Sequence, residues 1–121
     1  MSNIQPINFQ TIDWNSIEKT MHPGDSGSAT WQTVQFAGLR IRVVEYSAGY
    51  MANHWCAKGH IVYCLQGAFV SELKNGASFS LTAGMSYIVS DDLSLHRSNT
   101  IDGVKLLIID GDFLQLHKND N

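Results

Sequence analysis

Three side chains that can bind a soft or borderline metal ion lie within seven residues of this sequence: His54, Cys56 and His60. Alternate side chains of an extended strand share one face, so all three would project together if the strand stays in register past Gly59. A fourth candidate, His96, follows further along the chain. Imidazole nitrogens and thiolates suit transition metals. We therefore predict a metal site formed by His54, Cys56, His60 and His96.

A simpler alternative is that these histidines are hydrogen-bonded inside the fold and that Cys56 packs as a small apolar residue. Two further residues could join the site. Cys64 has the strand parity of His60, but a buried core thiol is the favoured interpretation. His22 lies in a His-Pro-Gly turn, where exposure to solvent is favoured. Whether either residue joins the site is left open by the sequence.

The elements that must position these residues are short strands. Residues 31–36 and 39–47 flank Ala37-Gly38, and residues 68–73 and 78–81 flank a turn that contains Asn75-Gly76; both patterns are typical of hairpins. Further strands are expected at 61–65, 85–89 and 104–109. About eight strands separated by Gly, Asn or Asp turns predict an all-β fold, namely an antiparallel β-barrel of the jelly-roll type.

Length and composition limit the classes of function. The chain has 121 residues, 44% hydrophobic residues and a net charge of -3, which predict one domain with one core. No basic stretch exceeds Arg40-Ile41-Arg42, so nucleic acid is not expected as a partner. No apolar run is long enough to span a membrane, and no signal peptide is recognisable. We expect a cytoplasmic protein whose cysteines are thiols.

The composition changes near residue 30. Residues 1–29 are expected to form an irregular N-terminal arm, with a turn of helix at 15–20 capped by Asp13 or Asn15. The barrel is expected at 30–114 and a polar tail at 115–121. The arm is too apolar to lie in water, so we predict that it packs on the barrel, on the same or a neighbouring subunit, and that the protein is a homodimer.

The spacing His54-x-Cys56-x3-His60-x6-Gly67 resembles the first motif of the cupins, G-x5-H-x-H-x3,4-E-x6-G. In the second cupin motif, Gly84 fits the first glycine, Ser90 falls on the proline position and Asp92 on the next glycine, and His96 arrives one residue late. From about Thr30 to Asp110 the chain is similar to a small single-domain cupin. It also resembles the DHCW-motif cupin-fold proteins, through the stretches 53–60, 83–87 and 96–98. The resemblance implies a fold and a site rather than a reaction.

Two residues depart from the cupin pattern. Cys56 stands where the second histidine would be, and His60 stands where the glutamate would be. Three histidines with one thiolate carry the same single negative charge as three histidines with one carboxylate, but the set is softer. A softer set favours a divalent transition metal, with zinc or iron first and nickel or copper as further candidates.

Two functions remain open. The first is a metalloenzyme, such as an oxygenase or an isomerase or lyase, acting on a small molecule held in the barrel. The second is a non-catalytic module that binds a small molecule or a metal in a regulatory or structural role. Tyr46, Tyr63, Tyr87 and Arg97 are candidates for the pocket wall. The charges of the strand at 39–47 are expected to face water, although an inward Arg40 or Arg42 would indicate an anionic ligand.

Overall fold

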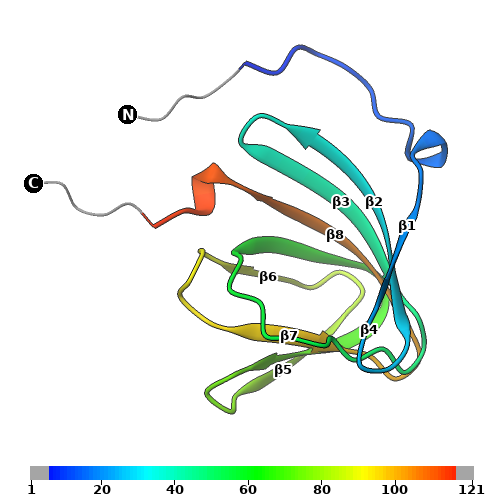
Figure 1. The fold of residues 1–121 in the computed structure, drawn as a ribbon, viewed down its shortest axis with the longest axis vertical. Helices are drawn as coiled ribbons and strands as arrows, with labels where there is room; N and C mark the ends of the chain where they lie inside the picture. Colours follow the sequence, from blue (N-terminus) through cyan, green and yellow to red (C-terminus); the bar gives the residue numbers. More distant parts are fainter. Residues whose placement is uncertain (1–5, 117–121) are drawn as a thin grey trace, which may run out of the picture.

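The computed structural model describes residues 6–116. Eight antiparallel strands and two short 3-10 turns, η1 (Trp14–Ser16) and η2 (Asp112–Leu114), make up the fold (Figure 1). The strands are β1 (Thr20–Pro23), β2 (Ser28–Phe36), β3 (Leu39–Tyr46), β4 (His60–Leu73), β5 (Ser78–Thr82), β6 (Ser86–Val89), β7 (His96–Asn99) and β8 (Val104–Gly111). The all-β prediction is confirmed. No helix among the described residues is long and apolar enough to cross a membrane.

The fourteen-residue strand β4 belongs to both layers of the fold. Its first half pairs with β8 and β6, and its second half pairs with β5 and β7. The register shifts between Cys64 and Gln66, and Gly67 has a φ of 86°, which favours glycine. This irregularity lets one strand pass between the layers. The sequence predicted two strands separated by Gly67, whereas the structure has one.

The segment between β3 and β4 closes the side of the barrel without forming a strand. Met51 pairs with both Ser26 and Asn99, and Cys56 pairs with His96. Residues 53 and 54 form a bend between these bridges. The prediction of a continuous strand through His54 and Cys56 is therefore wrong. The bend interrupts the alternation of side chains between the two faces of a strand, on which that prediction rested.

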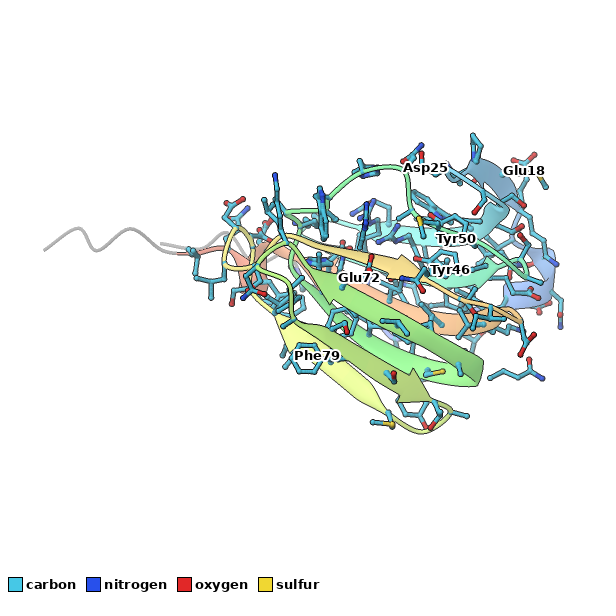
Figure 2. The ribbon with its side chains drawn as sticks, turned by 90° about the horizontal axis from the view of Figure 1, so that it is seen from below. Glu18, Asp25, Tyr46, Tyr50, Glu72 and Phe79 are labelled. Atoms are coloured by element: carbon cyan, nitrogen blue, oxygen red, sulfur yellow. The ribbon has the colours of Figure 1, made fainter. Side chains whose placement is uncertain are left out.

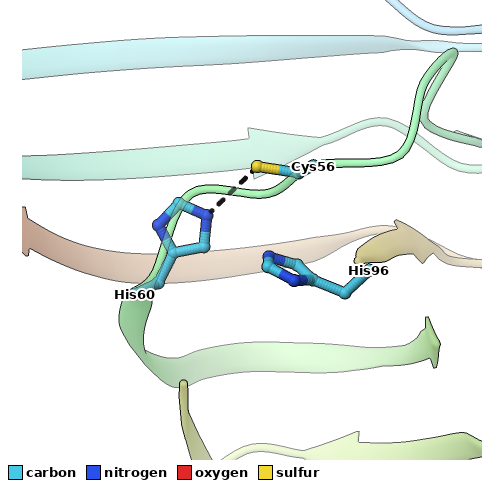
Figure 3. A group of neighbouring side chains, drawn as sticks. All are labelled: Cys56, His60 and His96. Atoms are coloured by element: carbon cyan, nitrogen blue, oxygen red, sulfur yellow. Dashed lines mark hydrogen bonds between the residues drawn. The ribbon is translucent and has the colours of Figure 1, made fainter. Parts of the chain in front are cut away.

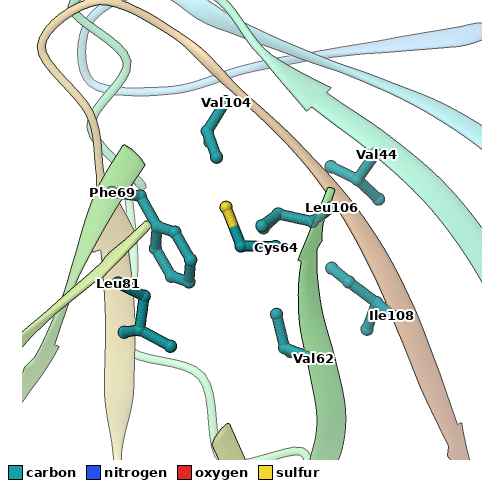
Figure 4. Packing of buried hydrophobic residues seen from close by; sticks show 8 residues of the cluster. All are labelled: Val44, Val62, Cys64, Phe69, Leu81, Val104, Leu106 and Ile108. Atoms are coloured by element: carbon teal, nitrogen blue, oxygen red, sulfur yellow. The ribbon is translucent and has the colours of Figure 1, made fainter. Parts of the chain in front are cut away.

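The hydrophobic core lies between the layers. It consists of Val44, Val62, Cys64, Phe69, Leu81, Val104, Leu106 and Ile108 (Figure 4). Cys64 is fully buried in this cluster, which confirms the prediction of a core thiol.

The sheet begins earlier than the sequence predicted. β1 and the start of β2 fall inside the range expected to be irregular, because β1 pairs with β2 from Thr20 onward. The predicted turn of helix is reduced to η1, and Asp13 caps it by accepting a hydrogen bond from the Asn15 amide. Gln32 on β2 donates to the carbonyls of Trp14 and Ile17, which holds this part of the arm on the sheet. Most of the predicted polar tail, residues 117–121, lies outside the described residues.

A row of apolar side chains crosses the outer face of the larger layer. Cross-strand pairing places Ile88 beside Ile61, Ile61 beside Ile109, and Ile109 beside Ile41. These residues alternate with the inward-facing residues of the same strands, so the row faces away from the core. Ile88 is 68% exposed. The homodimer stays a prediction, and this row is the surface on which it can be tested.

We expect light scattering after gel filtration to give twice the 13.4 kDa monomer mass. Ile88→Lys should shift the protein to monomer, because a buried interface does not tolerate an unpaired charge. Ile101→Lys is the matched control, since Ile101 is also exposed but lies in the turn before β8. A monomeric wild type over the whole accessible concentration range would contradict the prediction.

Candidate metal centre

Three of the four predicted ligands meet at one end of the barrel. His60 is the first residue of β4 and His96 is the first residue of β7, while Cys56 lies in the closing segment. The backbones of Cys56 and His96 are joined by two hydrogen bonds, of 2.7 Å and 3.1 Å. One potential ligand atom from each of Cys56, His60 and His96 lies within 4.8 Å of the other two (Figure 3).

Both imidazole rings are oriented by hydrogen bonds on their outer nitrogens. His60 Nδ1 donates to Asp110 Oδ2 at 3.2 Å, and His96 Nδ1 donates to the Ser94 carbonyl at 2.8 Å. Because these acceptors cannot donate, each neutral ring keeps the lone pair on Nε2. His60 Nε2 lies 3.7 Å from Cys56 Sγ, and His96 Nε2 is buried without a hydrogen-bond partner. An orphaned buried nitrogen beside a thiol and a second imidazole fits a metal ligand set.

The fourth predicted ligand, His54, is not part of this group. It lines the same cavity, but its side chain is exposed and its Nδ1 lies 2.7 Å from Asn53 Oδ1. Asn53 in turn donates to the Pro23 carbonyl at 3.3 Å. These local bonds accompany the bend at residues 53 and 54. The role of His54 as a metal ligand stays a prediction.

The other histidine that the sequence left open lies elsewhere. His22 Nε2 is 2.8 Å from Thr20 Oγ1, and the His22 ring stacks on Trp31 with 3.8 Å between centroids. Of the described histidines and cysteines, only Cys56, His60 and His96 form a cluster with the geometry to hold a metal ion.

A buried carboxylate behind His60 was not predicted from the sequence. Asp110 on β8 is 2% exposed and accepts hydrogen bonds from Arg40 Nε at 3.0 Å and Nη2 at 2.9 Å, and from Arg42 Nη2 at 3.2 Å. Burial by itself would raise the pKa of Asp110, but His60 and Arg40 hold it well below its usual range. The only signal in the sequence is that Asp110 continues the even spacing of Val104, Leu106 and Ile108, which would place it on the inner face.

Arg42 also departs from the prediction. We expected the charges of its strand to face water, but Arg42 is 5% exposed and lines the cavity. Its guanidinium lies 4.5 Å from the centroid of the Trp31 ring. Burial and the neighbouring Arg40 lower its pKa. A cation is tolerated here because Asp110 and an aromatic face offset part of the cost of burial.

The cavity in front of the three ligands has a volume of about 190 Å³. Tyr46, Tyr87 and Arg97 line it as predicted, whereas Tyr63 is 42% exposed and is not among the lining residues. Tyr46 and Tyr50 stack with 4.2 Å between centroids, and Figure 2 shows them side by side. Burial raises the pKa of both Tyr46 and Tyr87, so their hydroxyls stay protonated at neutral pH. The cavity therefore combines aromatic walls with hydroxyl and guanidinium donors.

The thiol of Cys56 is unusually acidic in this setting. Burial alone would raise its pKa, but the neighbouring imidazoles of His60 and His96 lower it to about 5. For His96, burial alone would lower the pKa, but Cys56 and the Ser94 carbonyl raise it. At neutral pH Cys56 is thus a thiolate, which is the form that binds metals.

The fold was compared with solved structures. An RmlC-like cupin from Shewanella frigidimarina superposes with a TM-score of 0.67 at 19% identity, over 86% of this chain and 91% of that one. A cupin-like protein from Thermotoga maritima has a TM-score of 0.67 at 14% identity, over 79% and 80% of the two chains. This chain has the cupin fold. A cupin-superfamily sugar phosphate isomerase from Silicibacter pomeroyi gives 0.66 at 15% identity, over 84% and 75%.

At these identities the similarity shows the fold alone. No family model matches the chain, and no match was found among curated proteins. One detail of the backbone agrees with the second cupin motif: Asp92, at the position of a motif glycine, has a φ of 63°. Aspartate tolerates this left-handed conformation better than most residues, which explains how the turn survives the replacement.

The lowered pKa of Cys56 gives a direct prediction. In metal-free protein, the rate of alkylation by iodoacetamide should be nearly constant from pH 8 to pH 6 and fall as the pH drops through about 5. An ordinary thiol, with a pKa near 8.5, would already lose most of its reactivity below pH 8. Cys56→Ser is the control for labelling of Cys64, whose pKa is raised by burial. A rate midpoint near 8.5 would contradict the prediction.

Proposed function

We propose that this cupin-fold protein binds one divalent transition metal through Cys56 Sγ, His60 Nε2 and His96 Nε2. The observation that carries the proposal is the buried, unpartnered Nε2 of His96, on a ring with a potential ligand atom within 4.8 Å of ligand atoms of Cys56 and His60. Leaving a buried nitrogen unsatisfied costs free energy, and a bound metal removes that cost. The carboxylate behind His60 also supports the proposal, since metal-binding histidines commonly donate to a carboxylate.

The donor set favours particular metals. One thiolate and two imidazoles suit zinc or iron, and also nickel or copper, better than the hard cations magnesium and calcium. Three protein ligands leave a coordination position for an exogenous molecule, as in catalytic zinc sites. When bound, the metal would supply Lewis-acid chemistry or a water of lowered pKa.

The function best supported is therefore a metalloenzyme acting on a small molecule in the cavity. Asp110 would hold His60 in the tautomer that presents Nε2, and the Ser94 carbonyl would do the same for His96. The protonated hydroxyls of Tyr46 and Tyr87 would be available as hydrogen-bond donors at the cavity wall. The acidity of Cys56 keeps the thiolate available at neutral pH.

One observation favours a second candidate, a non-catalytic binding module. His54 lines the same cavity from an exposed bend. If His54 completes a four-ligand set, the site closes, and closed tetrahedral zinc sites are structural.

Elemental analysis of untagged protein reconstituted with zinc tests the ligand set. We expect about one zinc per chain in the wild type and strong loss in His96→Ala, because that variant removes the orphaned nitrogen. His54→Ala is the matched control, and it should retain the metal if the site has three ligands. Wild-type protein that takes up no transition metal would contradict the proposal, and loss of zinc from His54→Ala would favour the closed site.

The carboxylate behind His60 gives a second prediction. Asp110→Asn should weaken zinc binding roughly tenfold to a hundredfold, as measured by competition with a chromophoric chelator, because the ligand orientation and basicity of His60 depend on it. Glu72→Gln is the control: it removes a carboxylate that bonds Arg97, with 2.8 Å between Arg97 Nε and Glu72 Oε1, rather than a ligand. Equal zinc affinity in Asp110→Asn and the wild type would show that Asp110 does not tune the site.

A further inference from the structure

The charges beside the metal centre do not balance. Asp110 is shared by two guanidinium groups, and Arg40 already occupies both of its oxygens with Nε and Nη2. Arg42 reaches the same carboxylate only through Nη2, at 3.2 Å. Two positive charges therefore face one negative charge, and the surplus lies at Arg42.

Arg42 is also short of hydrogen-bond acceptors. A guanidinium carries five N–H donors, and the only side-chain hydrogen bond that the structure gives Arg42 is the one to Asp110. Its Nε is buried without any partner, although the residue is 95% removed from solvent and lines the cavity. Trp31 covers one face of the guanidinium at 4.5 Å, and His22 stacks on Trp31 in turn. The described residues therefore leave the buried Nε–H of this guanidinium without an acceptor.

The other basic groups at the cavity are already paired. Lys58 lies 3.5 Å from Asp91, and Arg97 lies 2.8 Å from Glu72. The remaining anion at the cavity is the Cys56 thiolate, whose charge a bound metal would take up. Neither of these two ion pairs nor the Cys56 thiolate offsets the surplus positive charge at Arg42.

We propose that the cavity binds a small carboxylic acid, whose carboxylate pairs with Arg42 and whose other end reaches the Cys56–His60–His96 centre. This inference rests on the proposed function, because it names the substrate class of that site. Arg42 Nη2 and His60 Nδ1 bond the same oxygen, Asp110 Oδ2, so one small molecule can span from Arg42 to the metal ligands. The volume of about 190 Å³ and the walls formed by Trp31, Tyr46 and Tyr50 suit a compact acid with an apolar body.

The first experiment observes Arg42 in the wild-type protein. The chain has three arginines, so a nitrogen–proton spectrum of their Nε–H groups holds three signals, assigned with Arg40→Lys and Arg97→Lys. Propanoate is the probe, propanamide is its uncharged isostere, and inorganic phosphate tests the alternative oxyanion. We expect a saturable shift of the Arg42 signal with propanoate and none with propanamide. No shift with propanoate, or equal shifts with both, would overturn the proposal, as would a response to phosphate alone.

The second experiment measures propanoate affinity by calorimetry in matched variants. Arg42→Gln should weaken binding about tenfold or more, because charge-assisted hydrogen bonds to the carboxylate are lost. Lys58→Gln removes the same charge from a paired residue at the same cavity and should leave the affinity unchanged. Equal weakening in both variants would show only a general electrostatic effect and overturn the assignment. If Arg42→Gln does not fold, the wild-type spectra decide.

Both experiments are run on metal-free and zinc-loaded protein, which separates the two proposals. The surplus positive charge arises from Arg40, Arg42 and Asp110 and does not depend on a metal, so propanoate should bind to the metal-free protein. It should bind more tightly to the zinc-loaded protein. If no metal binds but the Arg42 signal still responds to propanoate, the metal proposal fails alone. If zinc binds and the Arg42 signal does not respond, the acid-binding proposal fails alone.

Discussion

The buried carboxylate of Asp110 links the fold to the site. It lies at the end of β8, directly opposite Arg40 on the neighbouring strand β3, and it also bonds His60 at the start of β4. An isolated buried carboxylate would cost several kcal/mol, so the charge is tolerated only because these partners converge on it. The same contacts that stabilise Asp110 orient His60 and confine Arg42. The contacts that join β3, β4 and β8 around Asp110 therefore also position the side chains of the site.

The two cysteines show how strongly position decides chemistry. Cys64 lies in the first half of β4 and belongs to the hydrophobic core. Burial raises the pKa of its thiol there, so it packs as an apolar residue. Cys56 is also partly buried, but His60 and His96 lower its pKa to about 5. The difference arises because the segment before β4 pairs with β7, which brings the backbone of Cys56 against that of His96. One residue type thus serves the core at one position and the site at the other.

The site is asymmetric in a way that suits an exogenous ligand. On one side, two oriented imidazoles and a thiolate leave the Nε2 of His96 unpartnered. On the other side, a buried guanidinium has fewer acceptors than donors. Unsatisfied groups of opposite character at the two ends of one small cavity are costly in an otherwise well-packed protein. Such a cost is commonly found where a protein binds something else.

The amino-acid sequence by itself determined the class of fold and pointed to three residues of the candidate site. Turn residues such as Asn75-Gly76 and the alternation within β2, β3 and β8 are local signals, so the hairpins and their faces could be predicted. The spacing of Cys56, His60 and His96 identified three residues that the structure brings together. β1 could not be foreseen, since a four-residue strand containing His22-Pro23 carries a turn signal and forms only by pairing with β2.

The tertiary structure alone decided which polar side chains face inward together. His54 is not part of the Cys56–His60–His96 cluster, because a bend, bonded through Asn53 to the Pro23 carbonyl, interrupts the alternation that placed it with Cys56. Asp110 and Arg42 can both face inward because each offsets part of the cost of burying the other, and the two residues lie 68 positions apart in the chain. Strand periodicity is a local property, whereas the compensation of a buried charge depends on partners that only the folded chain brings together.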